Sequence, residues 1–515
     1  MKKNAIRILI GLLLLALLLF AFAACEDGVS DIPDISDISD TPDTPDTPDT
    51  PDTPDTPDTP DTPDTPDTPD TPDTPDTPDT PDTPDTPDTP DTPDTPDTPD
   101  TPDTPDTPAI YTVRGTTIIG LTEYGNTLTA LDIPREIDGV TVTIIDSYAF
   151  YNCTGLTSIT IPDSVTSIGG SAFSGCSKLA TVTLGENSQL TSIGGSAFSG
   201  CSSLTSITIP SGVTSIGVFA FYGCSSLTSI TIPSGVTSIG DCAFLGCYSL
   251  SGVYITDLAA WCNISFADNP LSYAMNLYLN GVLVTDLVIP SSVTSIGGYA
   301  FSGYRKLATV TFGENSQLTS IGDYAFKGCS SLTSITIPSG VMSIGDSAFY
   351  GCSSLTSITI PSGVTSIERD TFRYCSKLAT VTFGENSQLT SIGVSAFLEC
   401  SLTSITIPSG VTSIGNSAFY DCSKLATVTF GEDSQLTSIR SYTFRGCSSL
   451  TSITIPSGVT SIGVFAFYDC SSLTAATFAN PNGWEADVTP VAVDDPATAA
   501  TYLKSTYCSC TWNRS

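Results

Sequence analysis

The sequence predicts a β-rich repeat solenoid, in which short parallel strands are joined by turns or one-turn helices, preceded by a disordered stalk. Two observations lead to this fold class. From about residue 140 one apolar pattern recurs at a nearly constant period, and the segment before it is a Thr-Pro-Asp tract with nothing apolar to bury. Fixed periods of roughly 20–50 residues are typical of stacked repeat architectures, and a chain of this composition cannot form a packed core in the tract itself.

A clean copy of the repeat runs from residue 204 to residue 224. Ile207 and Ile209 alternate with Ser and Thr, which predicts a short strand with one apolar face. A Pro-Ser-Gly turn follows, then a second short extended stretch with Val213 and Ile216, and then an Ala-Phe pair that we expect to point inward. One copy has too few apolar side chains to fold alone, so neighbouring copies must stack to close a continuous core.

Each copy ends in a Phe-x-x-Cys element, and most successive copies are 23 residues apart, as from Cys201 to Cys224. The period becomes 25 where the Pro-Ser-Gly turn is replaced by Gly-Glu-Asn-Ser-Gln, as at 185–189, which marks this turn as a surface loop. Tyr304 takes the place of the cysteine in a thirteenth copy. The cysteines that end the other copies are Cys153, Cys176, Cys201, Cys224, Cys247, Cys329, Cys352, Cys375, Cys400, Cys422, Cys447 and Cys470.

One cysteine per repeat predicts a ladder of buried free thiols. Residues stacked in parallel strands lie about 4.8 Å apart, whereas the Cβ atoms of a disulfide lie about 3.8 Å apart. The cysteines outside the pattern are the better disulfide candidates: Cys242, Cys262, Cys508 and Cys510. The Cys508-Ser-Cys510 pair alone is a weak metal motif, and we expect no metal site.

The pattern divides the chain into five segments. Within the oversized repeat, Asp257–Cys262 is expected to be helical, and Asn280-Gly281 to form the turn of a hairpin. In the last segment we expect a helix at Pro496–Thr506, with Trp484 and Trp512 covering the end of the core. The segments are a signal peptide at 1–24, the stalk with its first cysteine at 25–108, an N-terminal cap at 109–139, repeats at 140–478 with the oversized repeat at 248–287, and a C-terminal cap at 479–515.

The N-terminus has the features of an export signal. Basic residues precede an apolar run from Ile8 to Ala24, which ends in Phe22-Ala-Ala-Cys25. This ending resembles the lipobox of bacterial lipoproteins, although Phe22 stands where an aliphatic residue is usual. The resemblance implies lipidation at Cys25 and anchoring in a membrane. The alternatives are a plain signal peptide or an uncleaved anchor helix. From Thr41, Thr-Pro-Asp occurs twenty-two times in succession, which predicts an extended, solvated spacer with a reach of up to about 200 Å.

Composition narrows the functional classes. The chain has no histidine and a formal net charge of −37, so Ser-His-Asp and Cys-His catalysis are excluded and nucleic acid is not expected as a partner. No carboxylate pair recurs at fixed positions, no glycine-rich phosphate loop opens a helix, and no basic stripe exists. We therefore expect no catalytic residues, no enzymatic activity and no cofactor.

The repeat motifs are Leu-x-x-Ile-x-Ile-Pro, Val-x-x-Ile-Gly and Ala-Phe-x-x-Cys. They resemble the leucine-rich repeats of the bacterial BspA-like surface proteins over roughly residues 110–478. The resemblance implies a solenoid of the leucine-rich-repeat type on an exported, membrane-anchored lipoprotein at the cell surface. Several members of that family are adhesins, which implies a protein or glycan ligand on a host or neighbouring cell. The alternative is a structural scaffold of the cell envelope without a specific ligand.

The residues beside Ala-Phe vary most among the copies and include many Tyr and Arg side chains, which are common in interface hot spots. We predict that this edge of the array carries recognition. The alternatives are that each Tyr only covers the core of the preceding repeat, or that the Ser and Thr ladders of the strand face bind glycan hydroxyls or ordered water. The predicted binding residues are Phe219, Tyr222, Tyr324, Tyr350, Arg373, Tyr374, Tyr420, Tyr442, Arg445 and Tyr468.

Overall fold

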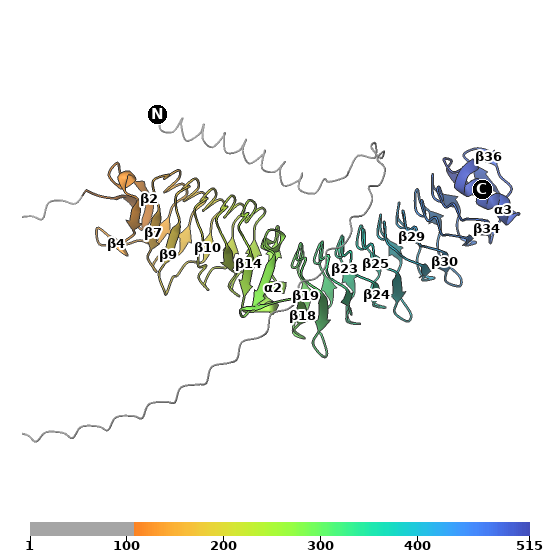
Figure 1. Cartoon of the computed structure of the whole chain (residues 1–515), viewed down its shortest axis with the longest axis horizontal. Helices are drawn as coiled ribbons and strands as arrows, with labels where there is room; N and C mark the ends of the chain where they lie inside the picture. Colours follow the sequence, from red (N-terminus) through yellow and green to blue (C-terminus); the bar gives the residue numbers. More distant parts are fainter. Residues whose placement is uncertain (1–107, 515) are drawn as a thin grey trace, which may run out of the picture. The chain divides into compact units, whose positions relative to one another are not determined.

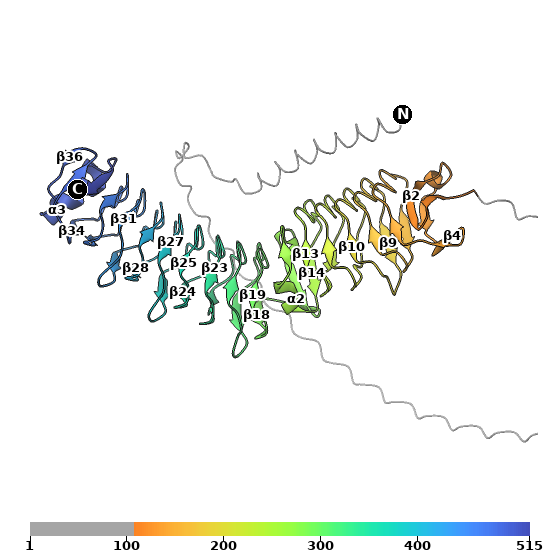
Figure 2. The same ribbon diagram turned by 180° about the vertical axis from the view of Figure 1, so that it is seen from behind.

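The computed structural model describes residues 108–514, in which successive repeats stack along one direction (Figures 1 and 2). Each regular repeat has a strand of up to four residues, a turn, a two-residue strand and tight turns around the buried Ala-Phe pair. This is the predicted solenoid of leucine-rich-repeat type. The predicted signal peptide, Cys25 and the Thr-Pro-Asp stalk lie outside the described residues.

The first strand of each repeat builds one face of the array, here called the strand face. Neighbouring strands pair in parallel and in register within several short sheets, as where Ile405 lies opposite Val428, but some neighbours, such as β26 and β28, are not paired. The apolar residues of each strand point into the core, and the Ser and Thr residues point outward. These strands are β3 (Ala130–Asp132), β7 (Ser158–Ile161), β9 (Thr181–Leu184), β12 (Ser229–Thr231), β14 (Gly252–Ile255), β16 (Asn276–Leu279), β18 (Asp286–Ile289), β20 (Thr309–Phe312), β22 (Ser334–Ile335), β24 (Ser357–Ile360), β26 (Thr380–Phe383), β28 (Ser404–Ile407), β30 (Thr427–Phe430), β32 (Ser452–Ile455) and β34 (Ala475–Phe478).

The second strand of each repeat builds a parallel ladder of Ser-Ile pairs. The threonine before each pair links the copies, because its hydroxyl donates to the carbonyl of the preceding copy, as from Thr214 to Thr191 at 3.2 Å. Glycine after the pair allows close stacking, since a Cβ on Gly217 would lie 2.5 Å from the backbone nitrogen of Gly195. The strands are β6 (Ile144–Ile145), β8 (Ser167–Ile168), β10 (Ser192–Ile193), β11 (Ser215–Ile216), β13 (Ser238–Ile239), β15 (Ser265–Phe266), β19 (Ser295–Ile296), β21 (Ser320–Ile321), β23 (Ser343–Ile344), β25 (Ser366–Ile367), β27 (Ser391–Ile392), β29 (Ser413–Ile414), β31 (Ser438–Ile439) and β33 (Ser461–Ile462).

Two ladders of buried side chains run through the core. The phenylalanines of the Ala-Phe pairs stack, with ring centroids 5.4 Å apart between Phe326 and Phe349 and nearly parallel planes. Beside them, the ladder thiols from Cys176 onward donate to a carbonyl of the preceding copy, as from Cys352 Sγ to Phe326 O at 3.2 Å. Burial raises the pKa of the Cys201 thiol to about 12. The predicted free-thiol ladder is confirmed, because the described ladder cysteines from Cys153 to Cys470 are all unbridged.

Three of the four cysteines outside the pattern, which were the better disulfide candidates, are not bridged. Cys262, Cys508 and Cys510 are free thiols. Cys262 is fully buried on α2 (Leu258–Cys262), so it fills core volume as the ladder cysteines do. Cys508 and Cys510 follow the last helical turn and are only partly buried.

The oversized repeat contains the predicted helix and hairpin. Asp257 caps α2 by accepting a hydrogen bond from the Ala260 N–H at 3.0 Å. A 3-10 turn, η2 (Pro270–Ser272), follows, and β16 then turns back as β17 (Val282–Leu283) through Asn280 and Gly281, whose φ angles are 51° and 80°. The Ser-Ile ladder stops at β15 and resumes at β19, and α2 lies between these two stretches (Figure 1).

Both ends of the core are covered. At the N-terminal end, β1 (Tyr111–Arg114) and β2 (Thr117–Leu121) form a hairpin that pairs with β6, followed by the turn η1 (Gly125–Thr127) and the hairpin of β4 (Glu136–Ile137) and β5 (Val140–Thr141). At the other end, β37 (Trp512–Arg514) pairs antiparallel with β33 and joins β35 (Trp484–Ala486) and β36 (Thr489–Pro490). Both predicted tryptophans are buried against Phe478, and the predicted helix is α3 (Pro496–Thr501), continued by the π-helical turn η3 (Tyr502–Thr506).

Candidate binding edge

The tight turns around Ala-Phe form a continuous third side of the array, here called the binding edge. It consists of the residue two before and the two residues after each ladder phenylalanine. Its backbone is held from repeat to repeat by hydrogen bonds, such as those from the Phe219 and Phe221 N–H groups to the carbonyls of Asp241 and Ala243, at 2.9 and 2.8 Å. Side chains on this edge therefore project from a braced backbone.

Several aromatic residues of the edge have a left-handed backbone. The φ angles of Tyr324 and Tyr442 are 56° and 61°, a region that costs a non-glycine residue about 1 kcal/mol or more. Equivalent positions in other copies hold Ser171 or Ser196 with similar φ angles of 54° and 56°. Since the backbone accepts serine equally well, the fold does not require an aromatic ring at this position. This favours a role of the ring in binding a partner.

A first cluster of rings and cations spans the copies from Tyr299 to Tyr374. Tyr299 and Tyr324 stack with centroids 4.7 Å apart. Lys327 lies over Tyr324 and over Tyr350, its nitrogen 5.3 and 5.6 Å from the two ring centroids. Burial lowers the pKa of Lys327. A partly desolvated cation between aromatic faces is a favourable contact that one further acidic or aromatic group from a partner would complete.

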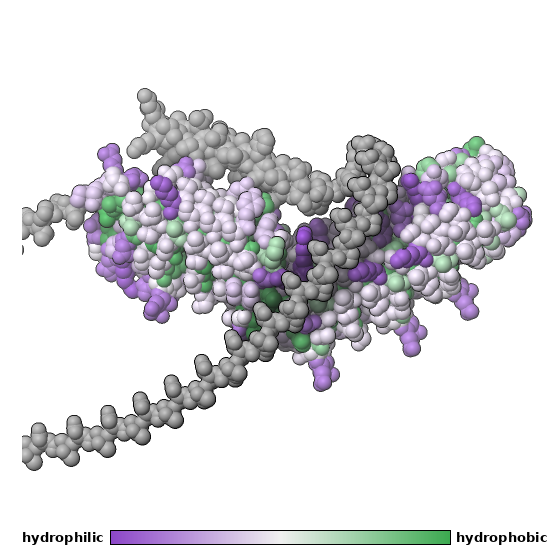
Figure 3. All heavy atoms as spheres, in the orientation of Figure 1, coloured by the Kyte–Doolittle hydropathy of each residue, from purple (hydrophilic) through white to green (hydrophobic). Residues whose placement is uncertain are grey.

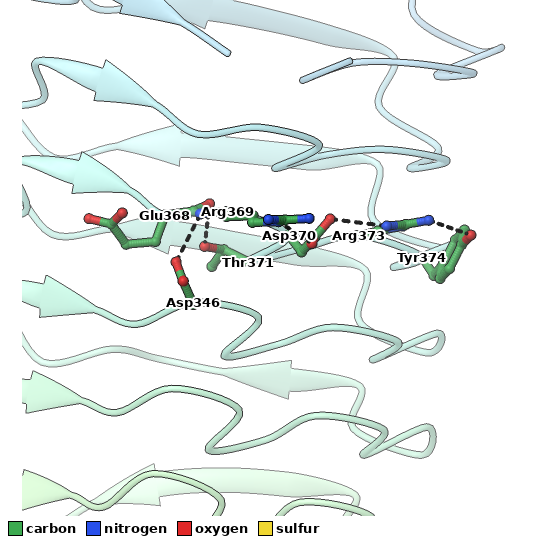
Figure 4. A network of polar contacts seen from close by, with 7 residues as sticks. All are labelled: Asp346, Glu368, Arg369, Asp370, Thr371, Arg373 and Tyr374. Carbon is green, nitrogen blue, oxygen red and sulfur yellow. Dashed lines mark hydrogen bonds and ion pairs between the residues drawn. The ribbon is translucent and has the colours of Figure 1, made fainter. Parts of the chain in front are cut away.

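The same cluster ends in an ionic network within one unusual copy (Figure 4). Arg373 lies 4.7 Å over the Tyr374 ring, donates to its hydroxyl at 2.9 Å, and pairs with Asp370 at 3.3 Å. Burial opposes the charge of Arg373, but the bond to Tyr374 and the nearby Asp370 carboxylate raise its pKa overall. Asp370 also pairs with Arg369 at 3.2 Å, and the Arg369 N–H donates to Asp346 of the preceding copy.

The carboxyl group of Asp346, next to this network, has a perturbed pKa. The pKa of Asp346 is raised by burial and by the neighbouring Asp323 and Glu368 carboxylates. Within the described residues, Arg373 Nε is the one buried side-chain nitrogen or oxygen without a hydrogen-bond partner.

A second cluster surrounds Arg445. Its guanidinium lies 5.3 Å from the Tyr420 ring centroid, 5.8 Å from that of Tyr442 and 5.2 Å from that of Tyr468. Phe465 packs between the last two rings, at 5.5 Å from each. One cation is thus shared by rings from three successive copies, an arrangement that depends on stacking and not on local sequence.

Eight of the ten predicted binding residues lie in these two clusters and are partly buried: Tyr324, Tyr350, Arg373, Tyr374, Tyr420, Tyr442, Arg445 and Tyr468. The other two lie on an earlier copy, where Phe219 packs edge-on against Tyr222 at 5.6 Å. Phe219 is only 5% exposed, so it supports Tyr222, which is 38% exposed, and is not itself available to a partner. Sequence reasoning missed Tyr299 and Asp370, although both occupy the variable position two residues before a ladder phenylalanine.

Neither a metal-ion site nor a membrane-spanning helix is present in the described residues. Between residues 108 and 514, no three Cys, Asp or Glu side chains are placed to hold a metal ion. Over that same span, no helix is long and apolar enough to cross a membrane.

The repeats match the model of a known family. The BspA type leucine rich repeat region matches six copies, at residues 141–271, 274–391 and 386–483. The chain belongs to the BspA-type leucine-rich repeat family. Members of this family are typically cell-surface proteins, and its solenoid is typically non-catalytic.

Solved structures include similar leucine-rich repeat proteins. A leucine-rich repeat protein from Bacteroides ovatus is 28% identical over 71% of this chain and 95% of its own, with a TM-score of 0.48. A leucine-rich cell surface protein from Faecalibacterium prausnitzii is 27% identical over 73% of this chain and 96% of its own, with a TM-score of 0.39. The pneumococcal vaccine antigen PcpA is 22% identical over 69% and 91%, with a TM-score of 0.39. No curated protein matches the sequence.

Proposed function

We propose that this chain is an exported, lipid-anchored adhesin that binds a protein ligand through the binding edge. The observation that carries the proposal is the pair of ring-and-cation clusters, centred on Arg373 and Arg445 and each built from several copies. Arg and Tyr are enriched among the residues that dominate protein interfaces. Cell-surface placement is typical of the family, and the lipobox-like ending at Cys25 supports membrane attachment.

The mixture of charges favours a protein over other partners. Lys327, Arg373 and Arg445 share the edge with acidic groups such as Asp370 and Asp421, so the edge presents neither a uniformly basic nor a uniformly acidic field. A nucleic acid or an anionic polysaccharide would meet repulsion from those carboxylates. A folded protein can complement both signs and fill the spaces between the rings.

The test is a triple substitution of Tyr350, Tyr374 and Tyr420 by serine in the intact chain, displayed on the surface of an expressing bacterium. Each lost hot spot is expected to cost about 1–2 kcal/mol, so adhesion to immobilised host matrix proteins or to neighbouring bacteria should fall at least about a hundredfold. Circular dichroism checks that the repeats remain folded. Tyr248→Ser is the matched control, because Tyr248 is 90% exposed and lies outside the clusters.

Undiminished adhesion of the triple variant would refute the role of the edge. Absence of saturable adhesion by the unaltered chain to every protein surface would favour the alternative function, a structural scaffold of the cell envelope.

A further inference from the structure

A different feature recurs on the strand face. The long Gly-Glu-Asn/Asp-Ser-Gln loop replaces the Pro-Ser-Gly turn in four copies, and at three of them a shallow recess, here called a step recess, lies between the loop and the shorter turn of the next copy. Three step recesses have cavity volumes of about 620, 570 and 530 Å³. They are lined by 182–189 with 208, 210 and 211, by 380–384, 386 and 387 with 404–406, 408 and 409, and by 427–431, 433 and 434 with 452–454, 456 and 457. The same segments line each one, so the recess is a product of the repeat and not of one irregular loop.

Each step recess has an aromatic or aliphatic wall and a hydroxyl floor. In the regular copies the last strand residue is a buried isoleucine, such as Ile360 or Ile407, whereas in the long copies it is Leu184, Phe383 or Phe430 and is only partly buried. The floor consists of outward Ser and Thr side chains from two successive copies, which in the recess at Phe383 are Thr380, Thr382, Ser404 and Thr406.

The overhanging loop is held rigidly. In the loop at 384–388, the Gly384 N–H donates to the Ile360 carbonyl at 2.8 Å and the Gln388 N–H to the Ser362 carbonyl at 2.9 Å. The Gln388 side-chain amide donates to the Asn386 carbonyl at 2.8 Å, and the loops at 313–317 and 431–435 repeat the same bonds within 0.2 Å. These loops are among the hydrophilic projections in Figure 3. The recess is therefore preorganised, which lowers the entropic cost of binding.

The charge and spacing of the recesses narrow the ligand class. None of the residues lining these recesses is basic, and the only acidic ones are Glu186 and Asp433, so an anionic ligand is disfavoured. The recesses at Phe383 and Phe430 are two copies apart, so they recur along the array. A site that recurs by translation suits a ligand that also repeats by translation and offers both hydroxyl groups and apolar C–H faces.

We propose that the step recesses of the strand face bind a linear, uncharged polysaccharide that lies along the array and fills neighbouring recesses. Its hydroxyls exchange hydrogen bonds with the Ser and Thr ladders, and the C–H face of a sugar ring packs on Phe383 or Phe430. Occupying two recesses with one chain strengthens binding because the second contact is intramolecular. The strand face and the binding edge share no residues, so this site is independent of the proposed protein-binding edge.

The test uses the full chain and affinity electrophoresis through gels containing galactomannan, xyloglucan or laminarin as uncharged probes and heparin as an anionic probe. The main variant replaces both Phe383–Leu389 and Phe430–Leu436 with Ile-Pro-Ser-Gly-Val, the sequence that the chain itself has at 360–364. This converts two long copies into regular ones and removes both overhangs. A second variant, Phe383→Ile with Phe430→Ile, keeps the loops and removes only the rings.

We expect at least one uncharged probe to retard the unaltered chain saturably, and the loop replacement to raise its dissociation constant tenfold or more. The ring variant should show a smaller loss in the same direction. The Tyr350, Tyr374 and Tyr420 serine variant should bind the polysaccharide unchanged, which separates this site from the binding edge. Retardation by heparin alone, by none of the probes, or equally in the unaltered and loop-replaced chains would overturn the proposal.

Discussion

Replacing one ring of the phenylalanine ladder tests how the array is held together. Phe349 is fully buried and stacks on Phe326 and Phe372, with centroids 5.4 and 5.5 Å away. Phe150, at the start of the ladder, is equally buried but stacks only on Phe173, at 4.9 Å. Truncating a buried phenylalanine to alanine costs about 3–5 kcal/mol, and each aromatic pair adds about 0.5–1.5 kcal/mol beyond its buried area. Phe349→Ala should therefore destabilise the chain by about 0.5–1.5 kcal/mol more than Phe150→Ala.

The assay is urea unfolding of both variants, followed by circular dichroism. Because each repeat contacts only its neighbours, a cavity in the middle of the array should also separate the unfolding of the copies on its two sides, giving a broader or two-step transition. The end variant should lose its first copies and keep one main transition. A loss below about 1 kcal/mol for Phe349→Ala, or a larger loss for Phe150→Ala, would refute the idea that ring stacking between copies stabilises the array.

Further predictions concern titration, reactivity and anchoring. Burial raises the pKa of Asp268 to about 6, so the folded state holds this proton more tightly than the unfolded state. The stability of the fold should therefore decrease as the pH rises from about 4 to 6. In urea unfolding, Asp268→Asn should add on the order of 2 kcal/mol of stability at pH 7 and nothing at pH 3. A thiol reagent at pH 8 should modify the partly buried Cys508 and Cys510 in the native chain but leave the buried Cys201 unmodified until urea is added, as detected by mass spectrometry. Labelling of Cys201 in the absence of urea would contradict the buried thiol ladder. Cys25→Ser should move the chain from the membrane fraction to the soluble fraction, and unchanged membrane association would refute lipid anchoring at that residue.

The regular part of the fold follows from the repeat alone. Ile207, Ile209, Ile216 and the Ala-Phe pair are buried as the sequence pattern predicts, but the strand expected at Ile207 and Ile209 is reduced to an isolated bridge between Ser206 and Thr181. The reason is physical: a copy with so few apolar residues has one way to bury them, which is against identical neighbours. The helix capped by Asp257 was predictable for a similar reason, because its cap and apolar residues are local in sequence.

Contacts between copies could be predicted only in part. Variation beside Ala-Phe identified Arg445 and Tyr468 as candidates, but the sharing of one guanidinium by three rings depends on side-chain directions set by stacking. The burial of Phe219 was missed because that position is exposed or buried according to its neighbour and not its own residue type. The sequence left open whether Cys508 and Cys510 are bridged, because their chain path follows the C-terminal helix, which the repeat does not define.

The step recesses show how a change in length creates a surface that a change in composition does not. Two extra residues cannot enter the core, since the strands before and after the loop remain in register with their neighbours, as Ser391 does with Ser366. The added length must therefore leave the array as a projection, and the next, shorter turn must leave a step beside it. Where the sequence of a copy changes without a change in its length, as at Glu368-Arg369-Asp370, the backbone hydrogen bonds between copies are kept. The new side chains then lie on the binding edge or directly beside it. Length variation and sequence variation thus act on two different sides of one scaffold, which is why the protein and polysaccharide sites proposed for them can be tested separately.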